Sequence, residues 1–393
     1  MTKRRDTIIC HAGLHPHDNH GVVNPPVYHA STITFPTMAE FESRGNPPFR
    51  GAQYGRSGTP TTFAFEEAVT ALHKGHRTVA FPSGLAAIAG TLLALLQNGD
   101  HLLMVDTVYA PTRKRLCGWL LARVGVETTF YDPTIGAGIR DLIRPNTKVV
   151  FLESPGSITF EMQDVPAIAG VCRAAGVLTV IDNTWSSPLL FQPLTCGIDY
   201  VVEAATKYVV GHSDAMLGTC TVATEDHYQD LKAATNSIGY SVGPDDCYLG
   251  ARGLRTLSVR LERHQKNALK VAEWLLARPE VAQVLYPALP DDPGHTLWKR
   301  DHSGASGLFG IVLMPAPKSA VAAMLDGLEL FGMGASWGGF ESLALPTYPA
   351  TLRTATKWPY EGPSVRLHIG LEDPEDLIDD LKAGLQRFEA ARS

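Results

Sequence analysis

The chain has 393 residues, of which 45% are hydrophobic and 19% charged, with a formal net charge of −6 and a pI near 6.2. This composition predicts a soluble globular protein with a core large enough for a larger and a smaller domain. The slight acidity gives no general attraction to nucleic acid or to anionic membranes, and the apolar run at 85–96 is too short to span a bilayer. Because the N-terminus has no apolar signal segment, we expect a cytoplasmic protein.

Neither the cysteines nor the histidines have the spacing of a metal site. The six cysteines are widely spaced and form no CxxC pair, which predicts reduced thiols rather than a disulfide framework or a zinc site. Four histidines near the start match no helical metal motif, so we expect no metal ion; they are His11, His15, His17 and His20.

Residues 1–60 show neither the helical nor the strand period and are rich in proline, glycine, histidine and aromatic residues. An irregular segment of this length is usually either disordered or functional. Because its aromatic residues argue against disorder, we expect an arm that lies over another surface, such as that of a neighbouring subunit.

From residue 62 onward, predicted helices and strands alternate along the chain. Apolar runs predict strands at 78–81, 101–105, 126–131, 148–152, 177–181 and 198–202. Helices are predicted at 62–73, 83–97, 111–124 and 165–175. This alternation favours an α/β fold with a mostly parallel sheet and helices on both faces, which binds its ligands at the carboxyl ends of the strands.

The C-terminal part has a different pattern. Apolar residues at helical spacing over 245–276 predict one long helix or a broken pair that links two domains. Beyond it, strands at 281–285, 308–313 and 365–369 mix with helices at 318–328 and 374–390, an α+β pattern. We therefore divide the chain into an arm (1–60), a large domain (61–250) and a small C-terminal domain (251–393).

One lysine stands in an unusual place, directly after an apolar strand. Lys207 follows the strand at 198–202 in a turn of small residues, and Asp182 follows the neighbouring strand at 177–181. Pyridoxal 5′-phosphate (PLP) needs a lysine amine to hold its aldehyde and an acid to keep its pyridine nitrogen protonated. The two residues therefore predict a PLP site at the carboxyl edge of the sheet.

Two segments have the chemistry to bind a phosphate group. The helix that opens at Ser83 offers free backbone N–H groups, although an ordinary N-cap followed by a packing glycine, Gly84, explains the same residues. Tyr54 and Arg56 offer a phenol and a guanidinium in the arm, and a turn with a solvated arginine is the alternative.

Two further residues suit a site for a flat cofactor and an amino acid. Tyr109 comes just after the strand at 101–105, where its ring could stack on the cofactor, and a tyrosine at a domain seam fits equally well. Arg366 lies inside the apolar strand at 365–369. A buried guanidinium needs a partner, and either a substrate α-carboxylate or a structural salt bridge would serve.

Taken together, four motifs resemble the Cys/Met-metabolism family of PLP enzymes, and the resemblance covers essentially the whole chain. The motifs are Tyr54-Gly55-Arg56, Ser83-Gly84-Leu85-Ala86-Ala87, Asp182-Asn183-Thr184-Trp185 and Ala205-Thr206-Lys207-Tyr208. The resemblance implies the aspartate-aminotransferase fold (PLP fold type I). Further motifs look like the bacterial cystathionine β-lyase branch, namely Gly211-His212-Ser213-Asp214, Ser336-Trp337-Gly338-Gly339 and Arg366-Leu367-His368-Ile369-Gly370.

Site roles follow from this resemblance residue by residue. It implies Lys207 as Schiff-base lysine and general base, Asp182 on the pyridine nitrogen and Tyr109 stacked on the ring. The residues implied at the phosphate are Gly84, Leu85 and Thr206, with Tyr54 and Arg56 reaching in from a neighbouring subunit. Those implied at the substrate are Arg366, Ser336, Trp337 and Tyr54. A shared site implies at least a dimer, and the family is usually a tetramer.

The implied reaction is the cleavage of L-cystathionine to homocysteine, pyruvate and ammonia, a step of methionine biosynthesis. A γ-lyase, a γ-synthase, action on other cysteine S-conjugates and a non-catalytic protein of this fold are the alternatives. Two departures from the branch concern the side that faces the distal end of the substrate. Ala335 stands where the branch has a tyrosine, and Arg113-Lys114-Arg115 stands where it has an acidic residue. The preferred thiol leaving group is therefore left open.

Overall fold

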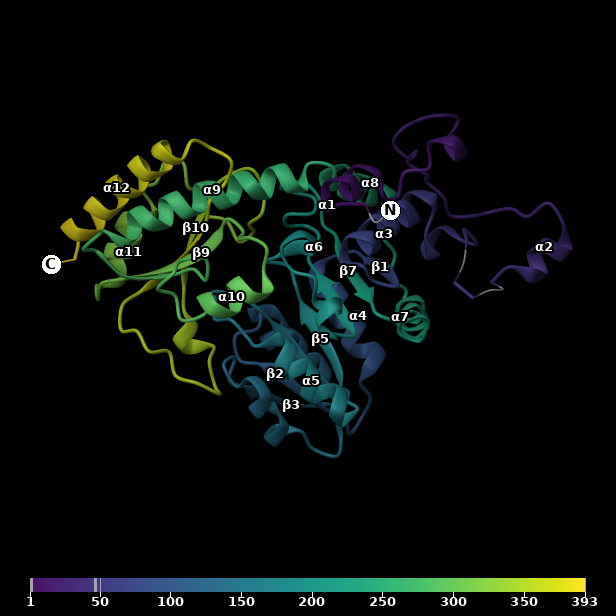
Figure 1. Ribbon diagram of the computed structural model, residues 1–393, viewed down its shortest axis with the longest axis horizontal. Coiled ribbons are helices and arrows are strands. Elements are labelled where there is room, and N and C mark those ends of the chain that lie inside the picture. Colours follow the sequence, from purple (N-terminus) through teal and green to yellow (C-terminus); the bar gives the residue numbers. More distant parts are fainter. Residues whose placement is uncertain (1–2, 46–47, 50, 393) are drawn as a thin grey trace.

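The computed structural model describes residues 3–45, 48–49 and 51–392 and contains two β-sheets (Figure 1). A seven-stranded sheet forms the centre of the larger part, and a four-stranded sheet lies near the C-terminus. A long helix, α9 (Leu257–Leu276), runs from the first part to the second. The predicted combination of an α/β part and a smaller C-terminal α+β part is confirmed.

The large sheet has the strand order β1-β7-β6-β5-β4-β2-β3. From β6 to β3 all neighbours are parallel, whereas β7 is antiparallel to both β1 and β6. The strands are β1 (Arg77–Phe81), β2 (His101–Val105), β3 (Glu127–Tyr131), β4 (Thr147–Glu153), β5 (Leu178–Asp182), β6 (Tyr200–Glu203) and β7 (Gly218–Val222). The sequence predicted the first six, and it missed β7.

Helices cover both faces of this sheet, which explains why its central strands are almost wholly apolar. Residues 149–152 of β4, for example, are fully buried. The helices are α3 (Pro60–His73), α4 (Gly84–Leu95), η3 (Thr112–Leu121), η4 (Gly136–Leu142), α5 (Val165–Ala175), α6 (Ser187–Leu190), η5 (Pro193–Cys196) and α7 (Glu225–Ile238). The predicted helix at 111–124 is a π-helix over most of its length, and α7 was not predicted.

The segment predicted as one long helix or a broken pair is a pair, α8 (Pro244–Leu254) and α9. The four-stranded sheet that follows is antiparallel, in the order β10-β11-β9-β8. Its strands are β8 (Val281–Leu285), β9 (Leu308–Leu313), β10 (Leu343–Thr347) and β11 (Ser364–His368). The remaining helices are α10 (His295–Asp301), α11 (Lys318–Leu325), η6 (Pro349–Thr351) and α12 (Pro374–Ala390).

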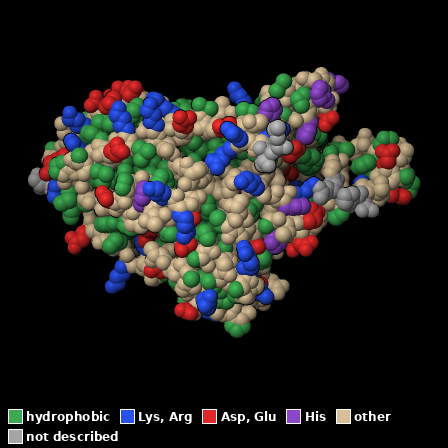
Figure 2. Space-filling model, in the orientation of Figure 1, with side chains coloured by type: hydrophobic (Ala, Val, Ile, Leu, Met, Phe, Trp, Pro, Cys, Tyr) green, Lys and Arg blue, Asp and Glu red, His purple; other side chains and the backbone are tan. Residues whose placement is uncertain are grey.

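The N-terminal arm contains short helices that the sequence did not predict: α1 (Arg5–His11), η1 (Pro16–Asn19), α2 (Met38–Ser43) and η2 (Gly55–Ser57). The part with α2 stands away from the body (Figure 1), and Met38 on it is 74% exposed. In Figure 2, several histidine side chains lie together at the end of the molecule formed by the arm. Over the rest of this face, positively and negatively charged side chains are interspersed. Boundaries near residues 60 and 250 stay a prediction.

Among the residues that the structure describes, none of the helices combines the length and the apolar character that crossing a bilayer requires.

Candidate active site

Lys207 and Asp182 lie at the same edge of the large sheet. Asp182 is the last residue of β5, and β6, which pairs in parallel with β5, leads into the turn that carries Lys207. The turn is held from behind by Arg260 of α9, whose guanidinium donates to the carbonyl of Tyr208 at 2.7 Å and to that of Gly253 at 2.7 Å. Gly253 has to be glycine here, because a Cβ atom would lie 2.3 Å from the carbonyl oxygen of Val209.

The amine of Lys207 points toward the C-terminal part of the chain. Its Nζ donates to Ser336 Oγ at 2.7 Å and lies 5.4 Å from the centre of the Trp337 ring. Burial, together with the positive charge of Arg366, lowers the pKa of Lys207 to about 8, and the negative charge of Asp182 opposes this shift. About a tenth of this lysine is therefore a neutral amine at pH 7, far more than for an exposed lysine.

The carboxyl group of Asp182 is buried and oriented. Its side chain accepts hydrogen bonds from the backbone N–H of Thr184 at 2.9 Å and from the Thr184 hydroxyl. Burial raises the pKa of Asp182 to about 6, although the two bonds from Thr184 oppose the shift. Because burial disfavours the ionised form of Asp182, a positively charged partner would stabilise its carboxylate.

Arg366 of β11 completes the cluster. Its guanidinium donates to the carbonyl oxygen of Ser336 at 2.9 Å, so Ser336 connects Arg366 to Lys207. Burial lowers the pKa of Arg366. In the part of the chain that the structure describes, no carboxylate lies within ion-pair distance of this guanidinium. The structural salt bridge that the sequence left open is therefore not formed among these residues.

The start of helix α4 lies against the turn that leads to Lys207. The Ser83 side chain caps the helix by accepting from the N–H of Ala86 at 3.1 Å. The N–H groups of Gly84 and Leu85, in the first turn, have no partner within the helix. Gly84 packs directly on Ala204, since a Cβ atom at Gly84 would lie 2.4 Å from the Ala204 Cβ. The first turn of α4 therefore lies against the turn that carries Lys207, with two N–H groups that the helix itself leaves unbonded.

Tyr109 is 44% exposed, as a ring that stacks on a ligand has to be. Its backbone N–H donates to Glu153 Oε2 at 2.8 Å. Glu153, the last residue of β4, is in register with Asp182. Burial and the charge of Asp182 raise the pKa of Glu153 well above its ordinary value. Glu153 was not among the predicted site residues, although an acidic residue directly after a predicted strand was a usable signal.

Comparison with known proteins agrees with this geometry. The family of Cys/Met metabolism PLP-dependent enzymes has a model that matches residues 6–386 of the chain. The chain belongs to this family. A cystathionine beta-lyase of Escherichia coli K12 is 45% identical, with 98% of this chain and 99% of that protein covered. A cystathionine beta-lyase of Salmonella typhimurium is 44% identical, with the same coverage.

Solved structures confirm the fold. A cystathionine gamma synthase of Xanthomonas oryzae pv. oryzae in complex with cystathionine has a TM-score of 0.90 and 34% identity, with 100% of both chains covered. The predicted PLP fold type I is thereby confirmed, and the chain is a PLP-dependent enzyme. The residues present fit PLP, because one edge of the sheet carries the amine of Lys207, the buried carboxyl group of Asp182 and the N–H groups at the start of α4.

Some predicted cofactor residues are not brought to this edge by the chain itself. Arg56 is exposed and donates to the carbonyl of Asn236, at the end of α7, at 3.0 Å. Tyr54 is 48% exposed, and in the described structure neither residue contacts Lys207 or Asp182. The Thr206 hydroxyl exchanges two hydrogen bonds with the backbone of Leu217, at 2.8 and 3.1 Å. Thr206 therefore stabilises the turn in this structure.

The basic run after Tyr109 needs a correction. Arg113 is buried, with its guanidinium 2.9 Å from the carboxylate of Asp106, so it is not free to meet a substrate. Lys114 and Arg115 are exposed, as is Ala335. Of the four residues in the two departures, Arg113 is therefore engaged within the protein, and Lys114, Arg115 and Ala335 are exposed.

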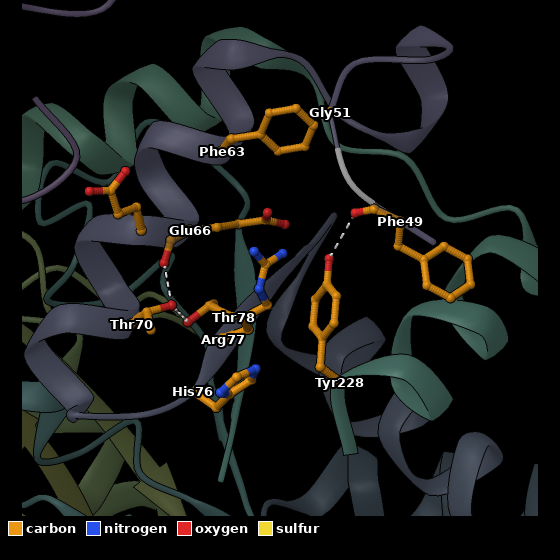
Figure 3. A pocket seen from close by; sticks show the side chains of 10 residues that line it. Phe49, Gly51, Phe63, Glu66, Thr70, His76, Arg77, Thr78 and Tyr228 are labelled. Atoms are coloured by element: carbon orange, nitrogen blue, oxygen red, sulfur yellow. Dashed lines mark hydrogen bonds between the residues drawn. The ribbon is translucent and has the colours of Figure 1, made fainter. Parts of the chain in front are cut away.

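Two hollows of the surface are lined by other residues. Figure 3 shows one of about 420 Å³, lined from α3, β1 and α7 by residues that include Glu66, Arg77 and Tyr228. The other, of the same volume, lies between η3 and residues 351–354. Neither lining includes Lys207, Asp182 or Arg366. The candidate active site is therefore identified by the chemistry of its residues and not by either of these hollows.

The raised pKa of Asp182 has a measurable consequence for the cofactor-free protein. In the unfolded chain this carboxyl has its ordinary pKa of 3.8, whereas in the folded protein the pKa is about 6. The folded state therefore holds the proton more tightly, and stability falls as the pH rises through this interval. At pH 8 the isosteric variant Asp182→Asn should be about 2–3 kcal/mol more stable than the wild type in denaturant unfolding.

The gain should shrink as the pH is lowered from 8 toward 5, because the wild-type carboxyl then becomes protonated in the folded state. An exposed aspartate, Asp141, offers the matched control Asp141→Asn, for which we expect no gain at either pH. If Asp182→Asn were instead less stable than the wild type at pH 8, the claim that burial disfavours the ionised Asp182 carboxylate would be contradicted.

Proposed function

We propose that this chain is a carbon–sulfur β-lyase that cleaves L-cystathionine to homocysteine, pyruvate and ammonia. The observation that carries the proposal is Arg366, a largely buried guanidinium that has no carboxylate partner among the described residues and is joined through Ser336 to the amine of Lys207. A substrate α-carboxylate would supply the missing partner and bring the substrate Cα close to the lysine. Relatives named cystathionine beta-lyase at 44–45% identity support the choice of substrate.

Asp182 and Lys207 would hold the cofactor. When bound, PLP supplies an electron sink that stabilises the negative charge left on the substrate Cα. The carboxylate of Asp182, fixed by Thr184, would pair with the protonated pyridine nitrogen and so recover the cost of its own burial. Tyr109 would stack on the ring, with its loop held by the bond from its N–H to Glu153.

Lys207 would also move the protons of the reaction. Once its Nζ is free, its lowered pKa suits it to take a proton from the substrate Cα near neutral pH. Ser336 Oγ, 2.7 Å from Nζ, would orient the amine during this transfer, and Trp337 would limit its movement from one side. With the Cα proton removed, cleavage of the Cβ–S bond releases the thiolate, which takes up one proton to become the thiol. The remaining three-carbon fragment is released and takes up one water molecule, which converts it to pyruvate and ammonia.

The phosphate of the cofactor would lie at the start of α4, on the N–H groups of Gly84 and Leu85 and beside Thr206. We propose that Tyr54 and Arg56 reach the phosphate of a neighbouring subunit, because the chain places them away from its own Lys207. Such sharing requires a dimer with two composite sites, and two dimers would form a tetramer. All six cysteines are free, which supports a reducing, cytoplasmic location.

The preferred thiol is set by the residues that face the distal end of the substrate. Lys114 and Arg115 are exposed on η3, which follows Tyr109 in the chain, and would favour a distal carboxylate, while Ala335 leaves room where a larger side chain would restrict it. We therefore propose that other cysteine S-conjugates are also cleaved, more slowly than cystathionine.

Product analysis with L-cystathionine tests this function. The purified protein loaded with PLP should release pyruvate and homocysteine in equal amounts, together with ammonia. Release of 2-oxobutyrate and cysteine instead would show γ-elimination and contradict the proposal.

A further inference from the structure

A buried aspartate outside the cofactor cluster binds the main chain of a distant segment. Asp106 directly follows β2, and its side chain is fully buried. Its carboxylate accepts from three consecutive backbone N–H groups, those of Thr354 at 3.0 Å, Ala355 at 3.0 Å and Thr356 at 3.2 Å. Residues 353–356, here called the strap, belong to the connection between β10 and β11. Asp106 thus joins the large sheet to the connection that leads into β11, the strand that carries Arg366.

Two arginines balance the charge of this carboxylate and reinforce the anchor. Arg113 Nη1 lies 2.9 Å from Asp106, and its other terminal nitrogen donates to the Thr354 hydroxyl. Arg353, in the strap itself, lies 3.7 Å from Asp106 and forms a two-pronged pair with Glu161 at 2.8 and 3.1 Å. Burial alone would raise the pKa of Asp106, but the bonds from Thr354 and Thr356 and the charge of Arg113 lower it overall.

The anchors of the strap stand on the two loops that form the active-site edge. Asp106 is three residues from Tyr109, and Glu161 follows β4, which ends at Glu153. The two loops are themselves joined, since the N–H of Ser157 donates to the carbonyl of Thr107 at 2.9 Å. The strap is therefore tied both to the loop that carries Tyr109 and to the loop after β4, whose last residue, Glu153, accepts from the N–H of Tyr109.

We propose that the strap is a fixed outer wall of the substrate site, that Asp106 is the positioning residue that holds it, and that this wall favours substrates with a long distal group over short ones. The nature of the substrate rests on the function proposed above. Asp106 makes no contact with Lys207, Asp182 or Arg366 among the described residues, so its effect has to pass through the strap. Because the anchor uses main-chain N–H groups, the wall is preformed before substrate binds.

Amide hydrogen exchange tests the anchor without any reference to activity. In the variant Asp106→Asn, which keeps the side-chain size but loses the charge, the amides of residues 354–356 should exchange on the order of tenfold faster or more. Glu161→Gln, which leaves Asp106 intact, should give a smaller acceleration in the same amides. The control Asp141→Asn should leave them unchanged. Unchanged exchange in Asp106→Asn would overturn the anchor.

Kinetics with two substrates of different length test the wall. For L-cystathionine, Asp106→Asn should raise KM by about tenfold or more with a smaller change in kcat. For S-methyl-L-cysteine, whose distal group is a single methyl, KM should stay close to that of the wild type. Glu161→Gln should change the ratio of the two KM values in the same direction. Equal changes for both substrates would show a general disturbance of the site and overturn the proposal.

The two proposals fail in different ways. A wild-type protein that releases pyruvate from neither substrate contradicts the proposed β-lyase function, whatever the exchange rates are. A wild-type protein that cleaves cystathionine, combined with an unchanged KM ratio in both variants, contradicts the strap alone.

Discussion

Replacing Lys207 with alanine is expected to abolish turnover and to remove the near-visible absorbance of the lysine-bound cofactor. The expected loss in kcat is on the order of 10³-fold or more, because in the proposed mechanism one side chain both holds the cofactor and transfers the Cα proton. The fold should persist, since Lys207 contributes one side-chain hydrogen bond, to Ser336, and its turn is held by backbone bonds and by Arg260.

The exposed lysine Lys266 on α9 provides the matched control. Lys266→Ala should retain both the absorbance and full turnover. Added alkylamines of lysine-like size should restore part of the activity of Lys207→Ala and leave that of the control unchanged. Full turnover by Lys207→Ala without added amine would refute the proton-transfer role.

Replacing Arg366 with methionine is the second change with a large expected effect. The substitution removes the proposed partner of the substrate carboxylate from a largely buried place, and it should weaken the free energy of substrate binding by about 2–5 kcal/mol. This corresponds to a rise in KM of roughly 30-fold to several thousandfold. Steady-state kinetics with L-cystathionine measure it, while the cofactor absorbance should remain, because Arg366 has no proposed contact with the cofactor.

Arg366→Lys separates charge from geometry. A lysine keeps the positive charge but lacks the planar fork that binds a carboxylate with two parallel bonds, so it should restore only part of the affinity. The exposed Arg140 of η4 offers the control Arg140→Met, for which KM should not change. An unchanged KM in Arg366→Met would mean that another residue binds the carboxylate.

The placement of Asp182 and Lys207 at one edge of the sheet could be predicted because the ends of buried strands can be recognised in the sequence. An apolar run that stops at a polar residue marks the carboxyl end of a buried parallel strand, so the order of residues alone assigns Asp182 and Lys207 to one edge of the sheet. Arg366 was conspicuous for a related reason, since a charged residue interrupts an otherwise apolar strand. Both patterns involve only residues that are neighbours along the chain, so both can be recognised in a single sequence.

Features that depend on long-range contacts could not be predicted in this way. Strand β7 lies between β1 and β6 and is antiparallel to both, which no local pattern reveals. Asp106 binds residues that lie 249 and 250 positions away in the sequence. It binds them through their main-chain N–H groups, so the contact does not depend on side-chain identity and cannot be recognised in the sequence. Arg113 was misjudged for the same reason, because its partner Asp106 is fixed by the fold and the arginine looked free in the sequence.

The position of the cofactor on the chain tests the account most directly. Borohydride reduction of the PLP-loaded protein, followed by digestion and mass spectrometry, identifies the lysine that carries the cofactor. We expect the added mass on the peptide that contains Lys207 and on no other lysine. A cofactor fixed to a different lysine, with Lys207 unmodified, would contradict the assignment of this site.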